Sequence, residues 1–250
     1  MKIIISPAKK MNAGVGSLPH RSLPVFADRA ERILSELKSM DYDALKKLWA
    51  ASDAICRQNV ERLEHMDLKN NLTPAILAYE GIQYQKMAPG IFTDREFEYV
   101  EEHLRILSGF YGILRPFDGV VPYRLEMQAK LPLDGKKDLY AWWGDSIAEE
   151  LLRDGGTIVN LASQEYSRAV EPFVRGKVPF VTCIFGEKTG DKIIEKGTRC
   201  KMARGEMVRF MAENDIRDVK DIRAFAGQGF QYSAEDSAPE TYVFVQKENQ

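Results

Sequence analysis

The pattern of apolar and polar positions along the chain predicts a mixture of helices and short strands. Residues 2–6 contain three consecutive isoleucines and are followed by Pro7, which is typical of a short buried strand. Residues 26–40 place apolar side chains at spacings of three and four, which predicts an amphipathic helix. We expect further helices at 52–66, 139–153 and 199–214, a strand at 157–161, and strand pairs at 178–185 with 191–196 and at 229–232 with 241–246.

The clearest helix start lies near the middle of the chain. Thr93 and Glu96 have the spacing of a capping box, and apolar residues then recur at three and four as far as Leu107. A tight turn with Gly109 and Gly112 follows, so the segment resembles the entry of a helix-hairpin-helix element. Proline and glycine soon afterwards cut short any second helix, and a purely structural turn remains the alternative.

These elements favour an α+β fold in one compact domain over residues 1–250. Helices and strands alternate too irregularly for a doubly wound sheet, and no repeat or Pro/Gly/Ser linker divides the chain. The 250 residues are 44% hydrophobic, an ordinary globular balance. The apolar runs are too short to span a membrane, and the first residues lack the pattern of a signal peptide. We therefore expect a cytoplasmic protein without membrane contact, and a monomer.

The charge balance restricts any nucleic-acid surface to a local patch. Lysine and arginine together number 35 against 37 acidic residues, for a net charge of −2. Residues 196–209 supply a candidate patch, because basic residues there outnumber the single acid. Lys201 and Arg204 lie three apart on one helix face. Gly205 beside them indicates close approach by another helix or by a phosphate backbone.

Cysteine and histidine usage argues against a metal centre. The three cysteines are widely spaced without a C-x-x-C pair, and the three histidines show no metal-ligand spacing. We expect no metal, no cofactor and buried free thiols. Direct iron storage is disfavoured for the same reason.

Two strand ends carry polar residues that could meet a ligand. Lys9 follows the first strand, and Asn160, Ser163, Glu165 and Tyr166 follow the strand at 157–161. If Ser163 caps a helix there, its first turn would offer N–H groups and a positive dipole end to a small anionic ligand. A plain helix cap, with Glu165 satisfying the dipole itself, is the alternative.

The glycine turn in the centre of the chain is a third candidate. Its backbone at Ser108, Gly109 and Gly112 could approach a phosphate closely, and Arg115 and Arg124 could grip phosphates with their guanidinium groups. Acidic residues two or three positions after each arginine offer structural partners instead.

Short sequence blocks spread over nearly the whole chain resemble those of the YaaA family of bacterial peroxide-stress proteins. The blocks are Ile5-Ser6-Pro7-Ala8-Lys9, Leu107-Ser108-Gly109, Tyr111-Gly112, Leu114-Arg115-Pro116, Pro122-Tyr123-Arg124-Leu125-Glu126-Met127, Lys137-Asp138-Leu139-Tyr140, Trp143-Gly144-Asp145, Asn160-Leu161-Ala162-Ser163, Glu165-Tyr166 and Ala203-Arg204-Gly205.

The resemblance implies a cytosolic protein that protects against hydrogen peroxide and is linked to lower free iron. It further implies a fold of its own, with a helix-hairpin-helix-like element at 108–114 and a positively charged cleft that binds double-stranded DNA. The cleft would draw on Lys9, Arg115, Arg124, Lys201 and Arg204. No catalytic residue carries over.

Two functional hypotheses follow. The first is a stress protein that binds double-stranded DNA through phosphate contacts, with little base readout. The second is an enzyme, glycosylase-like or lyase-like, that acts on a nucleotide or on damaged DNA in a pocket around Lys9, Asn160 and Glu165. The sequence leaves open whether there is catalysis at all.

Overall fold

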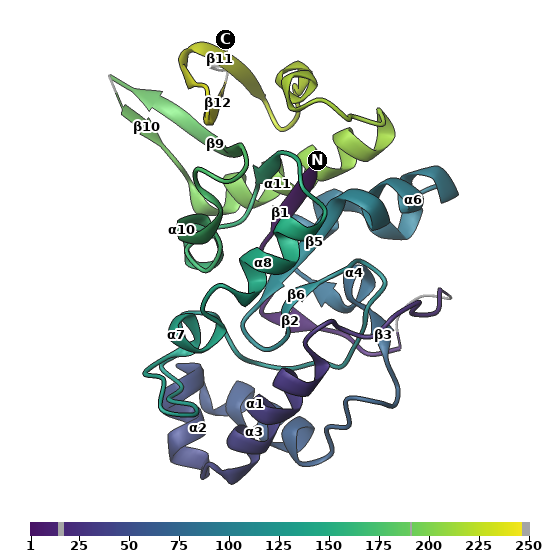
Figure 1. Ribbon diagram of the computed structural model, residues 1–250, viewed down its shortest axis with the longest axis vertical. Helices are drawn as coiled ribbons and strands as arrows, with labels where there is room; N and C mark the ends of the chain where they lie inside the picture. Colours follow the sequence, from purple (N-terminus) through teal and green to yellow (C-terminus); the bar gives the residue numbers. More distant parts are fainter. Residues whose placement is uncertain (15–17, 191, 247–250) are drawn as a thin grey trace.

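A mixed β-sheet forms the centre of the molecule (Figure 1), in a computed structural model that describes residues 1–14, 18–190 and 192–246. The order of its strands is β11-β12-β9-β8-β1-β5-β6, and β10 pairs with the outer part of β9. The strands are β1 (Lys2–Ile5), β5 (Leu104–Ser108), β6 (Gly112–Leu114), β8 (Ile158–Asn160), β9 (Phe180–Thr189), β10 (Lys192–Ile194), β11 (Phe230–Ala238) and β12 (Thr241–Gln246).

Parallel pairing defines the middle of this sheet. β1 lies between β5 and β8 and is parallel to both, and β8 continues parallel to β9. Ile3, Ile4 and Ile5 are fully buried, as expected for a strand covered on both faces. From β1 the chain first adds β5 on one side and later β8 on the other. The strand order therefore reverses at β1, which is where open sheets leave a crevice at the carboxyl ends of the strands.

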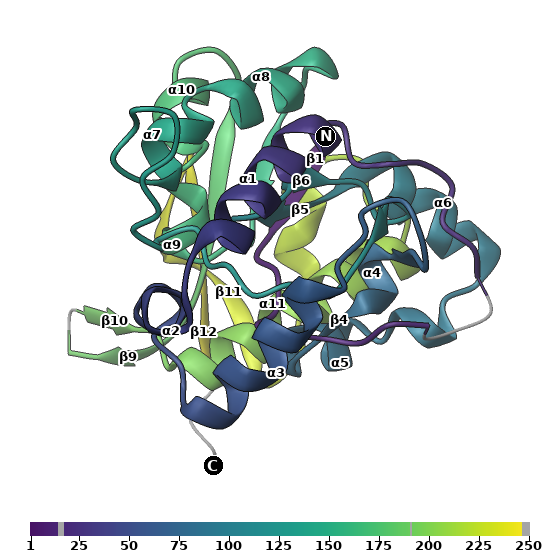
Figure 2. The same ribbon diagram turned by 90° about the horizontal axis from the view of Figure 1, so that it is seen from below.

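Helices cover both faces of the sheet. Figures 1 and 2 place α8 and α10 on one face and α6 and α11 on the other. The helices are α1 (Ala27–Ser39), α2 (Tyr42–Trp49), α3 (Asp53–Glu64), α4 (Ala75–Ala78), α5 (Ile82–Met87), α6 (Asp94–His103), α7 (Leu139–Trp143), α8 (Ser146–Arg153), α9 (Gln164–Ser167), α10 (Glu171–Val174) and α11 (Gly197–Glu213), with 3-10 turns η1 (Pro89–Ile91) and η2 (Val219–Ala224).

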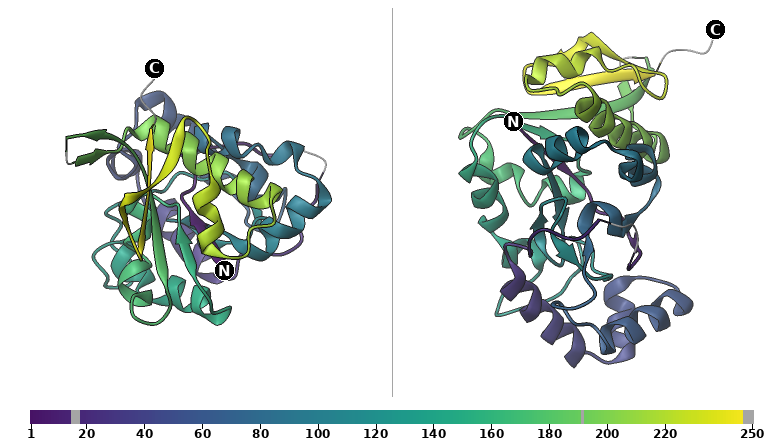
Figure 3. Two further views of the ribbon diagram at one scale, coloured as in Figure 1. Left: turned by 90° about the horizontal axis from the view of Figure 1, so that it is seen from above. Right: turned by 90° about the vertical axis from the view of Figure 1, so that its right-hand side faces the viewer.

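The two ends of the molecule are built differently. Figure 3 shows α1 to α3 at one end and the β11–β12 pair at the other. Two small ladders brace the irregular chain between them, one formed by β2 (Lys10–Met11) with β4 (Tyr79–Glu80) and one by β3 (Thr73–Pro74) with β7 (Gly119–Val120). No helix in the described part of the chain is long and apolar enough to cross a membrane.

Most predicted elements are present at nearly their predicted positions. The capping box at Thr93 and Glu96 begins α6, and the predicted helices at 26–40, 52–66 and 199–214 correspond to α1, α3 and α11. The mixed α/β character is also confirmed. The parallel pairing of β5, β1 and β8 was not predicted, because these three strands are only three to five residues long and lie far apart in the sequence.

Three local predictions need correction. The helix predicted at 139–153 is two helices, because Gly144 adopts a positive φ of 54° between them. Thr73 followed by Pro74 also has the pattern of a helix cap with proline at the first helical position, but the two residues pair as β3 and α4 begins at Ala75. The hairpin predicted at 178–185 with 191–196 is present, but its ladder joins residues 187–189 of β9 to residues 192–194 of β10, so the first strand is longer than predicted. Residue 191 lies outside the described residues.

The helix-hairpin-helix element predicted at 108–114 is a β-hairpin instead. Helix α6 ends at His103, and Leu104 to Ser108 continue directly as β5, which pairs with β1. The apolar spacing that suggested a longer helix runs across this junction, and pairing with the central strand overrides it. Ser108 and Gly112 then face each other across a β-hairpin, and its turn is buried.

Candidate functional site

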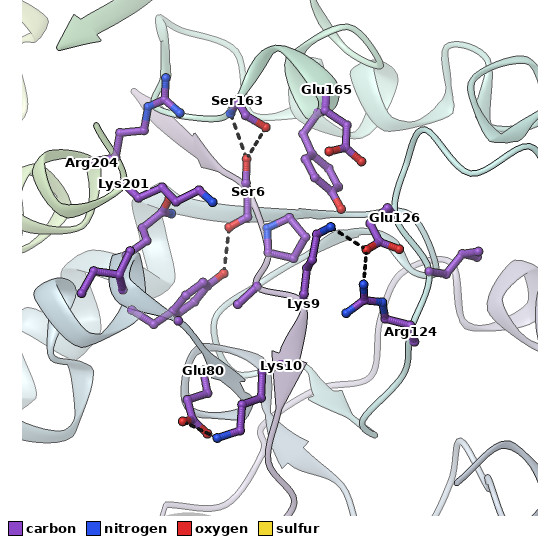
Figure 4. Close-up of a pocket in the computed structure, with 18 of the residues that line it drawn as sticks. Ser6, Lys9, Lys10, Glu80, Arg124, Glu126, Ser163, Glu165, Lys201 and Arg204 are labelled. Atoms are coloured by element: carbon purple, nitrogen blue, oxygen red, sulfur yellow. Dashed lines mark hydrogen bonds and ion pairs between the residues drawn. The ribbon is translucent and has the colours of Figure 1, made fainter. Parts of the chain in front are cut away.

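A cavity of about 360 Å³ opens at the carboxyl ends of β1 and β8 (Figure 4). Ser6 follows β1 and Ser163 follows β8, and both line the cavity. Because the two strands are parallel neighbours, their ends meet. The backbone N–H of Ser163 donates to Ser6 Oγ at 2.9 Å, and the two hydroxyl oxygens lie 3.1 Å apart. The cavity thus occupies the crevice that the strand order creates.

An irregular segment, residues 121–133, forms a second wall. Glu126 Oε1 lies 3.2 Å from Lys9 Nζ and 2.9 Å from Arg124 Nη2, so two cations share one carboxylate. The side chains of Arg124 and Glu126 are only 11% and 12% exposed, whereas that of Lys9 is 66% exposed. The arginine is therefore a fixed part of the wall, and the lysine reaches the cavity from the solvent side.

Helix α11 supplies a third wall through Lys201 and Arg204. Arg204 Nη2 donates to Glu195 at 3.1 Å, and its side chain is 12% exposed. The helix approaches α5 very closely at Gly205, where a Cβ would lie 2.0 Å from the carbonyl oxygen of Gln83. The close approach predicted for this glycine is confirmed, and the partner is a helix.

Tyr84 on α5 ties this wall to the first strand. Its hydroxyl donates to the carbonyl of Ser6 at 3.0 Å. Tyr84 is almost fully buried, and burial raises the pKa of its phenol well above the ordinary value. The phenol therefore stays protonated and serves as a hydrogen-bond donor that fixes the turn after β1.

Glu165 and Tyr166 complete the lining, but not as the sequence predicted. Helix α9 is a single turn, and the Ser163 side chain does not cap it. A single turn has only a small dipole, so the geometry at Ser163 supports neither the predicted anion site nor the alternative of a plain side-chain cap. Glu165 is half-buried and accepts a bond from the backbone N–H of Gln128 at 3.3 Å. Burial raises the pKa of its carboxyl, and the nearby Glu126 adds to that shift.

Several residues expected at the site lie elsewhere. Asn160 does not line the cavity: it is 3% exposed, accepts from the N–H of Ala162 and donates to Thr182. Arg115 faces Glu150 at 3.8 Å and lines a separate cavity of about 170 Å³. Lys9, Arg124, Ser163, Glu165, Tyr166, Lys201 and Arg204 are the predicted residues that do meet.

The glycine turn contributes to the site indirectly. Ser108 and its two glycines are buried and cannot reach a phosphate. Ser108 Oγ instead lies 2.7 Å from the hydroxyl of Tyr123, and a Cβ on Gly109 would lie 2.7 Å from the carbonyl oxygen of Leu125. The turn therefore holds the segment that carries Arg124 and Glu126.

Sequence reasoning missed the side of the cavity formed by residues 80–84. Glu80 pairs with Lys10 at 2.6 Å, and that contact comes from the two-residue ladder between β2 and β4. A ladder so short leaves no periodic signal in the sequence. Ser6 did have a signal in the sequence, since it directly follows a buried strand and lies three residues before Lys9.

The chain as a whole is similar to known bacterial proteins. A family model described as peroxide stress protein YaaA matches residues 1–236. A UPF0246 protein of Desulfitobacterium hafniense is 53% identical over 245 residues, 98% of each chain. UPF0246 proteins of Agathobacter rectalis and Pediococcus pentosaceus are 49% and 48% identical over 99% of each chain.

The mixed sheet, with a parallel centre and helices on both faces, makes this an α/β protein, and the charged cavity lies at the switch point of the sheet, where open α/β sheets commonly bind ligands. The matches are more specific, and the chain belongs to the peroxide stress protein YaaA family.

Proposed function

We propose that this protein acts in peroxide defence by binding double-stranded DNA through its phosphates. A second cavity of about 490 Å³ adjoins the first and shares Lys9 and Glu126 with it. Lys9, Lys47, Lys130 and Lys201 are exposed and line one or both cavities, and we call these four the lysine rim. The proposal rests on the position of the lysine rim, because exposed, flexible ammonium groups can contact backbone phosphates whatever the base sequence.

The charge of the lysine rim is available to a ligand. Lys47, Lys130 and Lys201 make no ion pair with any residue in the described part of the chain. The pair of Lys9 with Glu126 is solvent-exposed on the lysine side, and such pairs are weak. Arg124 and Arg204 are each held by an acid and are mostly buried, so lysines rather than arginines would contact the duplex.

Phosphate binding offers a physical link to iron. DNA carries a condensed layer of cations, and a protein that neutralises phosphates releases them. Ferrous iron in that layer reacts with peroxide next to the sugar and base. We propose that the lysine rim displaces this iron and so limits iron-dependent oxidative damage to DNA.

A salt series tests the DNA contact directly. Affinity for a short duplex, measured by fluorescence anisotropy, should fall steeply with salt, and changing all four rim lysines to Gln should reduce the slope of log K against log salt by about 3 to 4. Arg115→Gln is a single-charge control, because Arg115 is also an exposed cation but lines the separate cavity. The DNA contact would be refuted if affinity did not change with salt concentration, or if the rim variant and the wild type had equal slopes of log K against log salt.

The iron link has its own assay. Wild-type protein should protect a plasmid from nicking by ferrous iron and peroxide, and the rim variant should not. Protection that survives in the rim variant would show that iron is limited by another route.

An enclosed carboxyl favours a second function, an enzyme acting on a nucleotide or on damaged DNA. Glu165 lies in the cavity beside Lys9, and its raised pKa suits a general acid or base. Incubation with oxidised duplexes should then release bases or cleave the strand, and Glu165→Gln should abolish the reaction. Intact oxidised duplexes after incubation with the wild-type protein would eliminate this function.

A further inference from the structure

The cavity at the switch point has a cationic pair on one wall and two carboxylates on the other. Figure 4 shows Lys201 and Arg204 on one side and Glu126 and Glu165 on the other, with Ser6 between them. Lys9 and Arg124 lie on the carboxylate side, where both pair with Glu126. The cationic pair comes from one face of α11 and the acidic pair from the segments after β7 and β8. A ligand that satisfies both walls must itself be bipolar.

Each wall has one charged group that makes no ion pair within the described residues. Glu126 already balances Arg124 and Lys9, whereas Glu165 makes no ion pair within the described residues and accepts from backbone N–H groups alone. On the opposite wall Lys201 is likewise unpaired, and Arg204 uses only Nη2 for Glu195. One unpaired cation and one unpaired carboxylate therefore face the same space.

The floor between the walls carries no charge. Tyr84, Tyr123 and Tyr166 line it and are almost fully buried, so they close the cavity with uncharged groups that suit the apolar ring of a ligand. Ser6 adds a hydroxyl at the narrow point where β1 and β8 meet. The volume of about 360 Å³ lies in the range of small-ligand pockets and is too small for a duplex.

We propose that this cavity binds one nucleotide unit, with its phosphate on Lys201 and Arg204 and the amino edge of its base on Glu165. A nucleotide supplies the anion, the flat ring and the N–H donors in one molecule. Inorganic phosphate would leave the carboxylate wall without a partner, and a nucleoside would leave the cationic wall without one. The unit is either a free nucleoside monophosphate or an unpaired nucleotide of a DNA strand, since both present the same groups.

This inference goes beyond phosphate contacts at the lysine rim and requires no catalysis. Lys201 belongs to both the lysine rim and the nucleotide site, so a Lys201 variant cannot distinguish the two. A Glu165 variant can, because a carboxylate contributes nothing to binding the backbone of a paired duplex.

Calorimetric titration with AMP and GMP tests the free ligand. IMP is the matched ligand, since it lacks both exocyclic amino groups and should bind at least fivefold more weakly. Lys201→Gln and Glu165→Gln should each weaken AMP or GMP binding about tenfold or more, and Arg115→Gln should leave it unchanged. The Gln at 165 preserves shape, and thermal melting checks that each variant is folded.

A second arm compares a fully paired duplex with one that carries a single unpaired nucleotide. If the unpaired nucleotide is the natural source, Glu165→Gln weakens binding of that duplex and leaves the paired duplex unchanged. The inference is overturned if neither free nor unpaired nucleotides bind, or if Glu165→Gln affects neither. Salt-dependent binding of the paired duplex would be unaffected by that result. Failure of the nucleotide inference is therefore distinguishable from failure of the DNA proposal.

Discussion

The crossing of α11 over α5 at Gly205 allows the most quantitative prediction. An alanine Cβ at this position would lie 2.0 Å from the carbonyl oxygen of Gln83 and 3.1 Å from the backbone nitrogen of Met87. Both neighbours are backbone atoms, so no side-chain rotation relieves the clash. The helices must separate, and the segment around Tyr84 must move away from Lys201 and Arg204.

The expected cost of Gly205→Ala follows from two opposing effects. Overpacking a well-packed contact costs about 1–3 kcal/mol, and a clash with backbone belongs at the upper end. Alanine regains about 1 kcal/mol of helix propensity over glycine. The net loss is therefore about 2 kcal/mol, which for a chain of this size lowers Tm by about 4–8 °C.

Thermal and urea unfolding measure this loss, and the same helix offers a control. Gly197 also lies in α11, has no atom within 4 Å of its would-be Cβ and does not adopt a positive φ. Gly197→Ala should leave stability unchanged or raise it slightly. A Gly205→Ala protein as stable as the Gly197→Ala protein would refute the account of the helix crossing.

Two further predictions concern buried titratable groups. Burial raises the pKa of the Cys183 thiol to about 12 and that of the Cys200 thiol to about 11. Both thiols should therefore resist alkylation at pH 8 in the native protein and react once guanidinium unfolds it. Rapid labelling of both thiols in the native protein would contradict this prediction. Burial lowers the pKa of His103, so the unfolded state takes up its proton first and stability should fall as pH drops through about 6.5. The urea midpoint of wild type should then decline more between pH 7.5 and pH 5 than that of His103→Gln, and parallel declines would exclude the effect.

Local signals in the sequence sufficed for the longer elements. The capping box at Thr93 and Glu96 begins α6 in the structure, and the apolar stripe at 26–40 is α1. Gly205 was also informative, because a glycine inside a helix costs stability unless something approaches closely. Each of these signals is carried by residues within a few turns of one another.

Non-local pairing explains most of the errors. The run from Phe97 to Leu107 has helical spacing throughout, yet its last residues pair with β1, about a hundred positions away, and become β5. Ser163 was expected to cap a helix and instead donates its N–H to Ser6 across the strand ends. Neither contact leaves a pattern within either segment, so only the assembled sheet reveals it.

The central glycine motif shows how a recognisable block can serve the site without touching a ligand. Its turn is buried, but Ser108 contacts Tyr123 and Gly109 leaves room for the backbone at Leu125. These contacts fix the segment that directs Glu126 into the cavity beside Lys9. The block is therefore a positioning element: it fixes Arg124 and Glu126 relative to the strand end at Ser6, and with them one wall of the proposed nucleotide site.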